Sequence, residues 1–79
     1  MPKILIVDDQ RNMRTTLAKM LRGASYEVEE AADGEQGCEK GAGGAYDAVL
    51  TDLRMGVKSG IDVLRAVKEA QPLTEVIVM

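Results

Sequence analysis

The sequence has 79 residues, 46% of them hydrophobic, and a formal net charge of −3 at pH 7, which indicates one small domain without the basic surface of a nucleic-acid-binding protein. Its apolar runs fall far short of the roughly 20 residues of a membrane span, and its N-terminus lacks the apolar core of a signal peptide. A single cysteine and no histidine exclude an internal disulfide and a soft-metal site, and they favour a cytoplasmic setting.

The first expected elements are a buried strand and an amphipathic helix. The apolar run Lys3–Val7 is rich in β-branched residues, which is typical of a strand buried on both faces of a parallel sheet. It ends at the adjacent acids Asp8 and Asp9. A helix is expected next and is stopped by Gly23. Its apolar face is predicted from residues at helical spacing, which are Met13, Leu17, Met20 and Leu21.

The second strand and helix are less regular in sequence. Alternating apolar and acidic residues over Tyr26–Ala31 suit an edge strand with one face in water. Asp33, with Gln36 three residues later, is a capping-box signal for a helix start. We expect a short, frayed helix, because interior glycines weaken helices. The glycines concerned are Gly37, Gly41, Gly43 and Gly44.

Two further strands flank a third helix. Asp47–Thr51 is expected to be a buried strand that ends at Asp52. After a loop containing Gly56 and Gly60, a helix is expected to end before Pro72. Its apolar face is predicted from a step of three, namely Ile61, Leu64, Val67 and Ala70. The last buried-type strand is Val76–Met79. The expected core fillers outside these strands are Met13, Met20, Cys38 and Met55.

The element order is therefore βαβαβαβ over residues 1–79, which predicts a single α/β domain with a doubly wound parallel sheet. Ligands of such sheets lie at the carboxyl ends of the strands, where the strand order reverses. Asp8, Asp9 and Asp52 follow two such strands, so we expect their carboxylates to converge. Clustered carboxylates take up a proton or a cation, and Mg²⁺ prefers oxygen ligands. A carboxylate beside this ion can attack phosphorus.

A plainer interpretation is that these acids only form turns and helix caps. Aspartate after a strand is common in both roles, and either Asp8-Asp9 or Asp52 alone would fit it. Their combination, at the ends of two buried-type strands separated by one βαβαβ passage, favours a functional site.

Four stretches of the sequence resemble the receiver domains of two-component response regulators, and the resemblance runs from Lys3 to Met79. The stretches are Ile4–Asp9, Asp33–Glu35, Tyr46–Met55 and Ser59–Leu64. The part from Asp52 to Met55 is most similar to receivers fused to sigma-54-dependent transcription activators. The resemblance implies the flavodoxin-like receiver fold and a signalling module that acts on an output domain, which we expect to be transcriptional.

The resemblance also implies roles for individual residues. Asp52 matches the phospho-acceptor, to which a histidine kinase donates its phosphoryl group. Asp9 matches the acid that ligates Mg²⁺ directly, and Asp8 matches its neighbour, which often acts through water. The backbone carbonyl of Arg54 matches a main-chain metal ligand, and Asp52 also belongs to the metal site.

The sequence departs from the family pattern in two ways. Gly56 stands where the family usually has proline, so we expect a more mobile loop. The family continues past the fourth strand with a hydroxyl residue, a helix, a strand ending in lysine and a final helix. We therefore expect an incomplete receiver, truncated after the fourth strand and lacking the last helix-strand-helix, whose phosphorylation is slow or undetectable. Its last strand is expected to pair with a second copy, as a homodimer or an element-swapped oligomer.

Two other functions remain open on the sequence. A Mg²⁺-dependent phosphatase of the haloacid dehalogenase type also uses a strand-end aspartate, but it needs Asp-x-Asp, whereas Asp8 and Asp9 are adjacent. We expect no enzymatic turnover of a phosphate ester. The second alternative is a phosphorylation-incompetent receiver that acts only as a dimerisation or interaction module.

Overall fold

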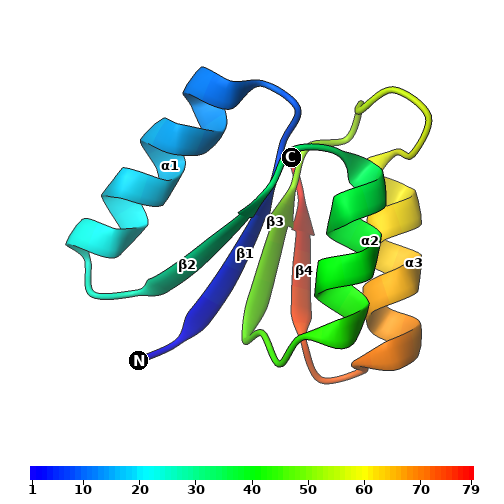
Figure 1. The fold of residues 1–79 in the computed structure, drawn as a ribbon. Helices are drawn as coiled ribbons and strands as arrows, with labels where there is room; N and C mark the ends of the chain where they lie inside the picture. Colours follow the sequence, from blue (N-terminus) through cyan, green and yellow to red (C-terminus); the bar gives the residue numbers. More distant parts are fainter.

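A computed structural model describes residues 1–79 as a parallel sheet of four strands with three helices. The strands are β1 (Lys3–Val7), β2 (Glu27–Ala31), β3 (Ala48–Thr51) and β4 (Glu75–Val78), and the helices are α1 (Arg11–Gly23), α2 (Gly34–Gly43) and α3 (Gly60–Ala70). The strand order is β2-β1-β3-β4, so the order reverses at β1 (Figure 1). The predicted α/β architecture is confirmed, with β2 as an edge strand. None of the helices could span a bilayer.

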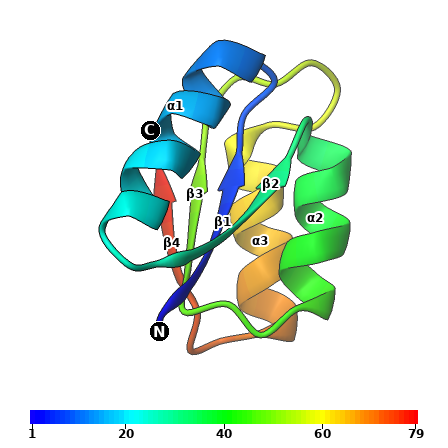
Figure 2. The same cartoon turned by 60° about the vertical axis from the view of Figure 1, so that its left-hand side comes forward.

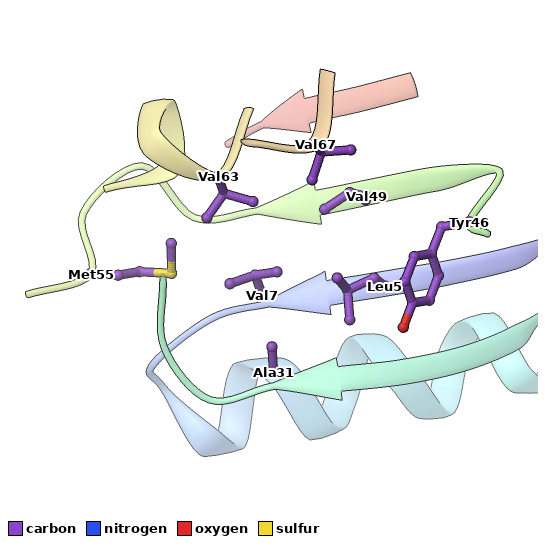
Figure 3. Packing of buried hydrophobic residues seen from close by; sticks show 8 residues of the cluster. All are labelled: Leu5, Val7, Ala31, Tyr46, Val49, Met55, Val63 and Val67. Carbon is purple, nitrogen blue, oxygen red and sulfur yellow. The ribbon is translucent and has the colours of Figure 1, made fainter. Parts of the chain in front are cut away.

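The sheet face under α2 and α3 holds the larger core. Figure 3 shows Val63 and Val67 pointing from α3 toward the side chains of β1 and β3. The buried cluster consists of Leu5, Val7, Ala31, Tyr46, Val49, Met55, Val63 and Val67. Tyr46 is its only aromatic member, so close aliphatic packing supplies most of its stability.

Helix α2, with ten residues, is the shortest of the three helices, as expected, and its fraying stays a prediction. Its predicted N-cap is confirmed, because the Asp33 side chain accepts a hydrogen bond from the backbone N–H of Gln36 at 2.8 Å. The glycines compensate for their low helix propensity by close approach. A Cβ on Gly37 would lie 2.6 Å from a methyl group of Val7, and one on Gly41 would lie 2.4 Å from Val67.

Helix α3 buries a face that only partly matches the predicted one, since Val67 is buried as expected and Leu64 is half-buried, but Val63 was not predicted. Val63 and Val67 are fully buried, whereas Ile61 and Ala70 of the expected face are exposed. Residues four apart lie on one side of a helix with 3.6 residues per turn, while a strict step of three rotates around it. The expected end before Pro72 is confirmed, since the helix stops at Ala70.

The opposite face of the sheet is covered by α1 alone (Figure 2). Ala18 is the one fully buried residue of α1, and the helix lies over β1 and β2, so that Ala48 and Leu50 of β3 are only half-buried on this side and Ile77 of β4 is exposed. Met13 and Met20 are 53% and 66% exposed. The expectation that they fill the core was therefore wrong, because no second helix lies beside α1. Met55, on the other face, is buried as expected.

Candidate functional site

The register of the sheet brings Asp8 and Asp52 side by side. Val7 of β1 pairs with Thr51 of β3, so the next residue of each strand starts a neighbouring loop. The backbone N–H of Asp52 donates to the carbonyl of Val7 at 2.9 Å, which continues this pairing beyond the strands. Because side chains alternate along a strand, Asp8 and Asp52 point to the α1 side of the sheet and Asp9 points the other way.

The three predicted acids meet in one cluster. Oxygen atoms of the Asp8, Asp9 and Asp52 carboxylates all lie within 4.8 Å of one another. The side chains differ in exposure, since Asp8 is buried, Asp9 is exposed and Asp52 is intermediate. All three ligand atoms are hard, anionic oxygens, which fit Mg²⁺ and not a soft metal.

Asp8 is held by one local hydrogen bond to its side chain and by one hydrogen bond from its backbone to a neighbouring strand. Its Oδ1 accepts from the N–H of Gln10 at 2.9 Å, and its own N–H donates to the carbonyl of Ala31 on β2 at 3.2 Å. Only 4% of Asp8 is exposed. The second carboxylate oxygen has no partner within the chain and is therefore available to a ligand.

Asp52 is fixed at the start of the following loop. Its Oδ1 accepts from the N–H of Leu53 at 2.8 Å, which leaves its second oxygen without a partner. A Cβ on Gly60 would lie 2.4 Å from the Asp52 carbonyl, so only glycine lets α3 begin against this strand end. The sequence reading placed Gly60 in the loop and missed this contact. The Ser59-Gly60-Ile61-Asp62 stretch carried the signal, because Ser59 and Asp62 form a capping box.

Helix capping does not account for the acids at the start of α1. The N-cap of α1 is Gln10, which makes no side-chain cap, and the first helical turn contains no acidic residue. Asp9 takes part in none of the side-chain hydrogen bonds of the chain, and Asp8 accepts a single local one. The turn-and-cap interpretation therefore fits Asp8, whose Oδ1 accepts from Gln10 two residues on, but it does not account for Asp9.

Two hollows border the cluster, one on each face of the sheet. The hollow on the α2 side has a volume of about 200 Å³ and is lined by Asp9, Asp33, Gly34, Glu35, Met55, Gly56, Val57 and Lys58. The hollow on the α1 side has a volume of about 390 Å³ and is lined by Asp8, Gln10, Met13, Leu17, Asp52 and Met79. The acids can thus be reached from both faces, which the sequence did not predict. Lys58 supplies the only cation of these linings.

The loop after β3 explains one departure from the family pattern. Gly56 has a φ of +58°, a left-handed conformation that proline cannot adopt. The expected mobility of this loop stays a prediction. Arg54 is exposed in the same loop, two residues after Asp52, and the role of its carbonyl also stays a prediction.

Residues 4–79 match the protein family described as "Response regulator receiver domain". One curated relative is Transcriptional regulatory protein ResD of Bacillus subtilis, 39% identical over 67 residues, a match that covers 85% of this chain and 28% of that protein. Another is Transcriptional regulatory protein ZraR of Klebsiella oxytoca, 40% identical over 76 residues, with 96% of this chain and 17% of that protein covered. The chain thus spans a minor part of these relatives.

Solved structures of a response regulator and of a receiver domain are also similar to this chain. Response regulator TrrA from Thermotoga maritima, in complex with Mg(2+)-BeF, has a TM-score of 0.92 and 33% identity, and the match covers 99% of this chain and 68% of that one. The receiver domain of a sensor histidine kinase from Pseudomonas aeruginosa has a magnesium ion coordinated in its active site cleft. Its TM-score is 0.89 at 30% identity, and 98% of this chain and 65% of that one are covered.

Proposed function

Because this chain belongs to the response regulator receiver domain family, we propose that Asp52 accepts a phosphoryl group from a histidine kinase and that an output domain responds to the change. The approach of three carboxylates to within 4.8 Å at the strand ends is the main support for this proposal. Relatives named as transcriptional regulatory proteins support a transcriptional output. The similarity to sigma-54-dependent activators stays a prediction.

Mg²⁺ is the proposed cofactor. Asp8, Asp9 and Asp52 would hold it, together with the backbone carbonyl of Arg54. When bound, the ion supplies positive charge that offsets the repulsion among the carboxylates and neutralises the transferring group. Solved relatives that contain magnesium support this choice.

Asp52 is the proposed nucleophile because one of its oxygens is left free. The N–H of Leu53 holds Oδ1, so the second oxygen can attack phosphorus. In transfer from a phosphohistidine, a bond forms between this oxygen and phosphorus while the phosphorus–nitrogen bond of the donor breaks. The leaving imidazole keeps the electron pair of that bond, and the product is an aspartyl phosphate.

Labelling with a small acyl phosphate tests this proposal. We expect slow incorporation of one phosphoryl group in Mg²⁺, measured by intact mass and lost when the cation is chelated. Asp52→Asn should abolish the labelling. Asp33→Asn is the matched control, because asparagine replaces aspartate well as an N-cap and Asp33 borders the neighbouring hollow. Equal labelling of Asp52→Asn and the parent chain would refute the role of Asp52.

We also propose that the chain is not a turnover enzyme. Its adjacent acids, Asp8 and Asp9, lack the Asp-x-Asp spacing of the phosphatases that use a strand-end aspartate. Phosphate esters such as p-nitrophenyl phosphate should therefore not be hydrolysed. Multiple turnovers that disappear with Asp52→Asn would contradict this.

A second copy of the chain is the proposed partner for the incompletely covered α1 side of β3 and β4. Ile77 and Met79 are 53% and 50% exposed there, beside the half-exposed Met13, and β4 forms an open sheet edge. Exposed apolar strand edges recruit other strands. Light scattering should give a mass above that of one chain at micromolar concentration, and a monomeric mass would contradict the proposal. A cytoplasmic location and the lack of nucleic-acid binding stay predictions.

A further inference from the structure

Arg14 of α1 connects the acidic cluster to the edge of the sheet. Its Nη1 donates to the backbone carbonyl of Asp8 at 2.8 Å, and its Nε donates to Oε1 of Glu30 on β2 at 3.1 Å. The Arg14 side chain is only 14% exposed. A partly buried guanidinium with two fixed acceptors has little freedom, because its donors form a planar fork.

The bond from Arg14 completes the fixation of the Asp8 backbone. The N–H of Asp8 is held by the carbonyl of Ala31, and its carbonyl is held by Arg14. With both peptide groups anchored and Oδ1 bonded to the N–H of Gln10, the free carboxylate oxygen has a defined direction. Mg²⁺ requires near-ideal octahedral geometry, so the direction of this oxygen affects its binding.

Arg14 also compensates for the missing side-chain cap at the N-terminus of α1. Gln10 caps the helix with no side-chain hydrogen bond. Arg14 therefore supplies the side-chain contact between the first turn of α1 and the strand end that carries the acids. A shift of α1 along the sheet would move the Asp8 carbonyl through this contact.

Glu30 balances the charge of Arg14. An uncompensated guanidinium near three carboxylates would compete with a bound cation, but the Glu30 carboxylate lies 3.1 Å from the Arg14 Nε. Further along α1, the Nη1 of Arg22 lies 3.7 Å from Oε2 of the same carboxylate. The Nη2 of Arg22 donates to the carbonyl of Val28 at 2.9 Å. Arg22 thus makes the same kinds of contact without touching the acidic cluster.

We propose that Arg14 is a positioning residue of the cation site, which sets the direction of the Asp8 carboxylate through its backbone carbonyl. This inference rests on the proposed Mg²⁺ site. Arg14 acts by geometry, since Glu30 neutralises its charge, and it links the site to α1 and β2.

Magnesium titration of two arginine variants tests the inference. Arg14→Met should weaken Mg²⁺ binding about tenfold, as expected for loss of an outer-shell partner of a metal ligand. Arg22→Met, the control on the same helix, should change the affinity by less than about twofold, because the contacts of Arg22 with Val28 and Glu30 lie away from Asp8. Affinities are measured with MgCl₂ by calorimetry, and urea unfolding checks that each variant is fully folded under the conditions of the titration. Stability alone then cannot explain the difference in Mg²⁺ affinity.

Arg14→Lys keeps the charge but not the fork, so it should also weaken binding several-fold. It replaces Arg14→Met if that variant does not fold. Equal Mg²⁺ affinity of the Arg14 and Arg22 variants would overturn the positioning role and leave the proposed function intact. A parent chain without measurable Mg²⁺ affinity would overturn both.

Discussion

The two faces of the sheet differ in how they are built. On the α2–α3 face, two helices enclose a buried cluster of eight residues, against which Val76 of β4 is partly buried. On the α1 face, one helix covers β1 and β2, and the buried cluster has four residues, Ile4, Ile6, Ala18 and Val28. The α2–α3 face is the thick face of the sheet and the α1 face is the thin one. The thick face therefore supplies most of the buried apolar surface that stabilises the fold.

The acidic cluster lies at the boundary of these two faces. Asp8 and Asp52 line the hollow on the thin side, and Asp9 lines the hollow on the thick side. The site thus combines rigid strand ends, anchored by the larger core, with access from a side that few side chains cover. The same central strands therefore serve stability on one face and access to the site on the other.

The largest expected effect is the difference in unfolding free energy when an apolar side chain is truncated on one face or on the other. Leu5→Ala removes a fully buried side chain from the thick face and should cost about 2–5 kcal/mol of unfolding free energy. Met13→Ala on the thin face should change it by less than about 0.5 kcal/mol, because the side chain is already half exposed. Urea unfolding measures both, and equal losses would remove the distinction between the faces.

A second prediction concerns the close approach of α2 to β1. Gly37→Ala would press a Cβ to within 2.6 Å of Val7, so overpacking should cost about 1–3 kcal/mol despite the better helix propensity of alanine. Gly43→Ala, at a position with no atom within 4 Å of the added group, is the control and should be neutral or slightly stabilising. Thermal unfolding of the pair checks this, and a stabilised Gly37→Ala would contradict the packing account.

The next largest expected effect concerns the N-terminal cap of α3, whose contribution to stability depends on pH. The N–H of Ser59 donates to the Asp62 carboxylate and lowers the pKa of that group. A lowered pKa means that this stabilisation is present above the unfolded pKa, near 3.8, and is lost as the pH falls toward the lower folded value. The protection of amides in the first turn of α3, taken relative to their intrinsic exchange rates at each pH, should therefore fall below about pH 4. Ser59→Ala should cost about 1 kcal/mol of unfolding free energy, because it removes the hydroxyl that accepts from the N–H of Asp62. Asp62→Asn removes the titrating carboxylate and should abolish the pH dependence, whereas an unchanged acid profile of this variant would contradict the assignment.

The smallest expected effect is on the thin face, at the turn between α1 and β2. Ser25 has a φ of 71°, which is unfavourable for a residue with a Cβ. Ser25→Gly should therefore stabilise the chain by up to about 1 kcal/mol, reduced by the greater entropy of glycine in the unfolded state. Thermal unfolding is the measurement, with Ala24→Gly as the control at a residue of negative φ. A loss of stability on Ser25→Gly would show that the turn is not strained.

The sequence predicted the strands and the meeting of Asp8, Asp9 and Asp52 because strand ends in a parallel sheet share one edge. It predicted the burial of helical side chains only in part, since Val67 is buried as expected but Val63 was not predicted. Met13 and Met20 have apolar spacing, but their exposure depends on whether a neighbouring helix exists. The roles of Gly37 and Gly60 depend on distances between elements far apart in the chain, which helix propensity alone cannot give.

The central claim is that acids from two separate strand ends share one divalent cation. Titration with Mn²⁺, a paramagnetic ion with ligand preferences like those of Mg²⁺, tests it directly through amide signals in NMR spectra. We predict that the signals of residues 8, 9 and 52–54 broaden together at the lowest Mn²⁺ concentration. Broadening that starts instead around Asp33 and Glu35, or that affects Asp52 separately from Asp8 and Asp9, would contradict the shared site.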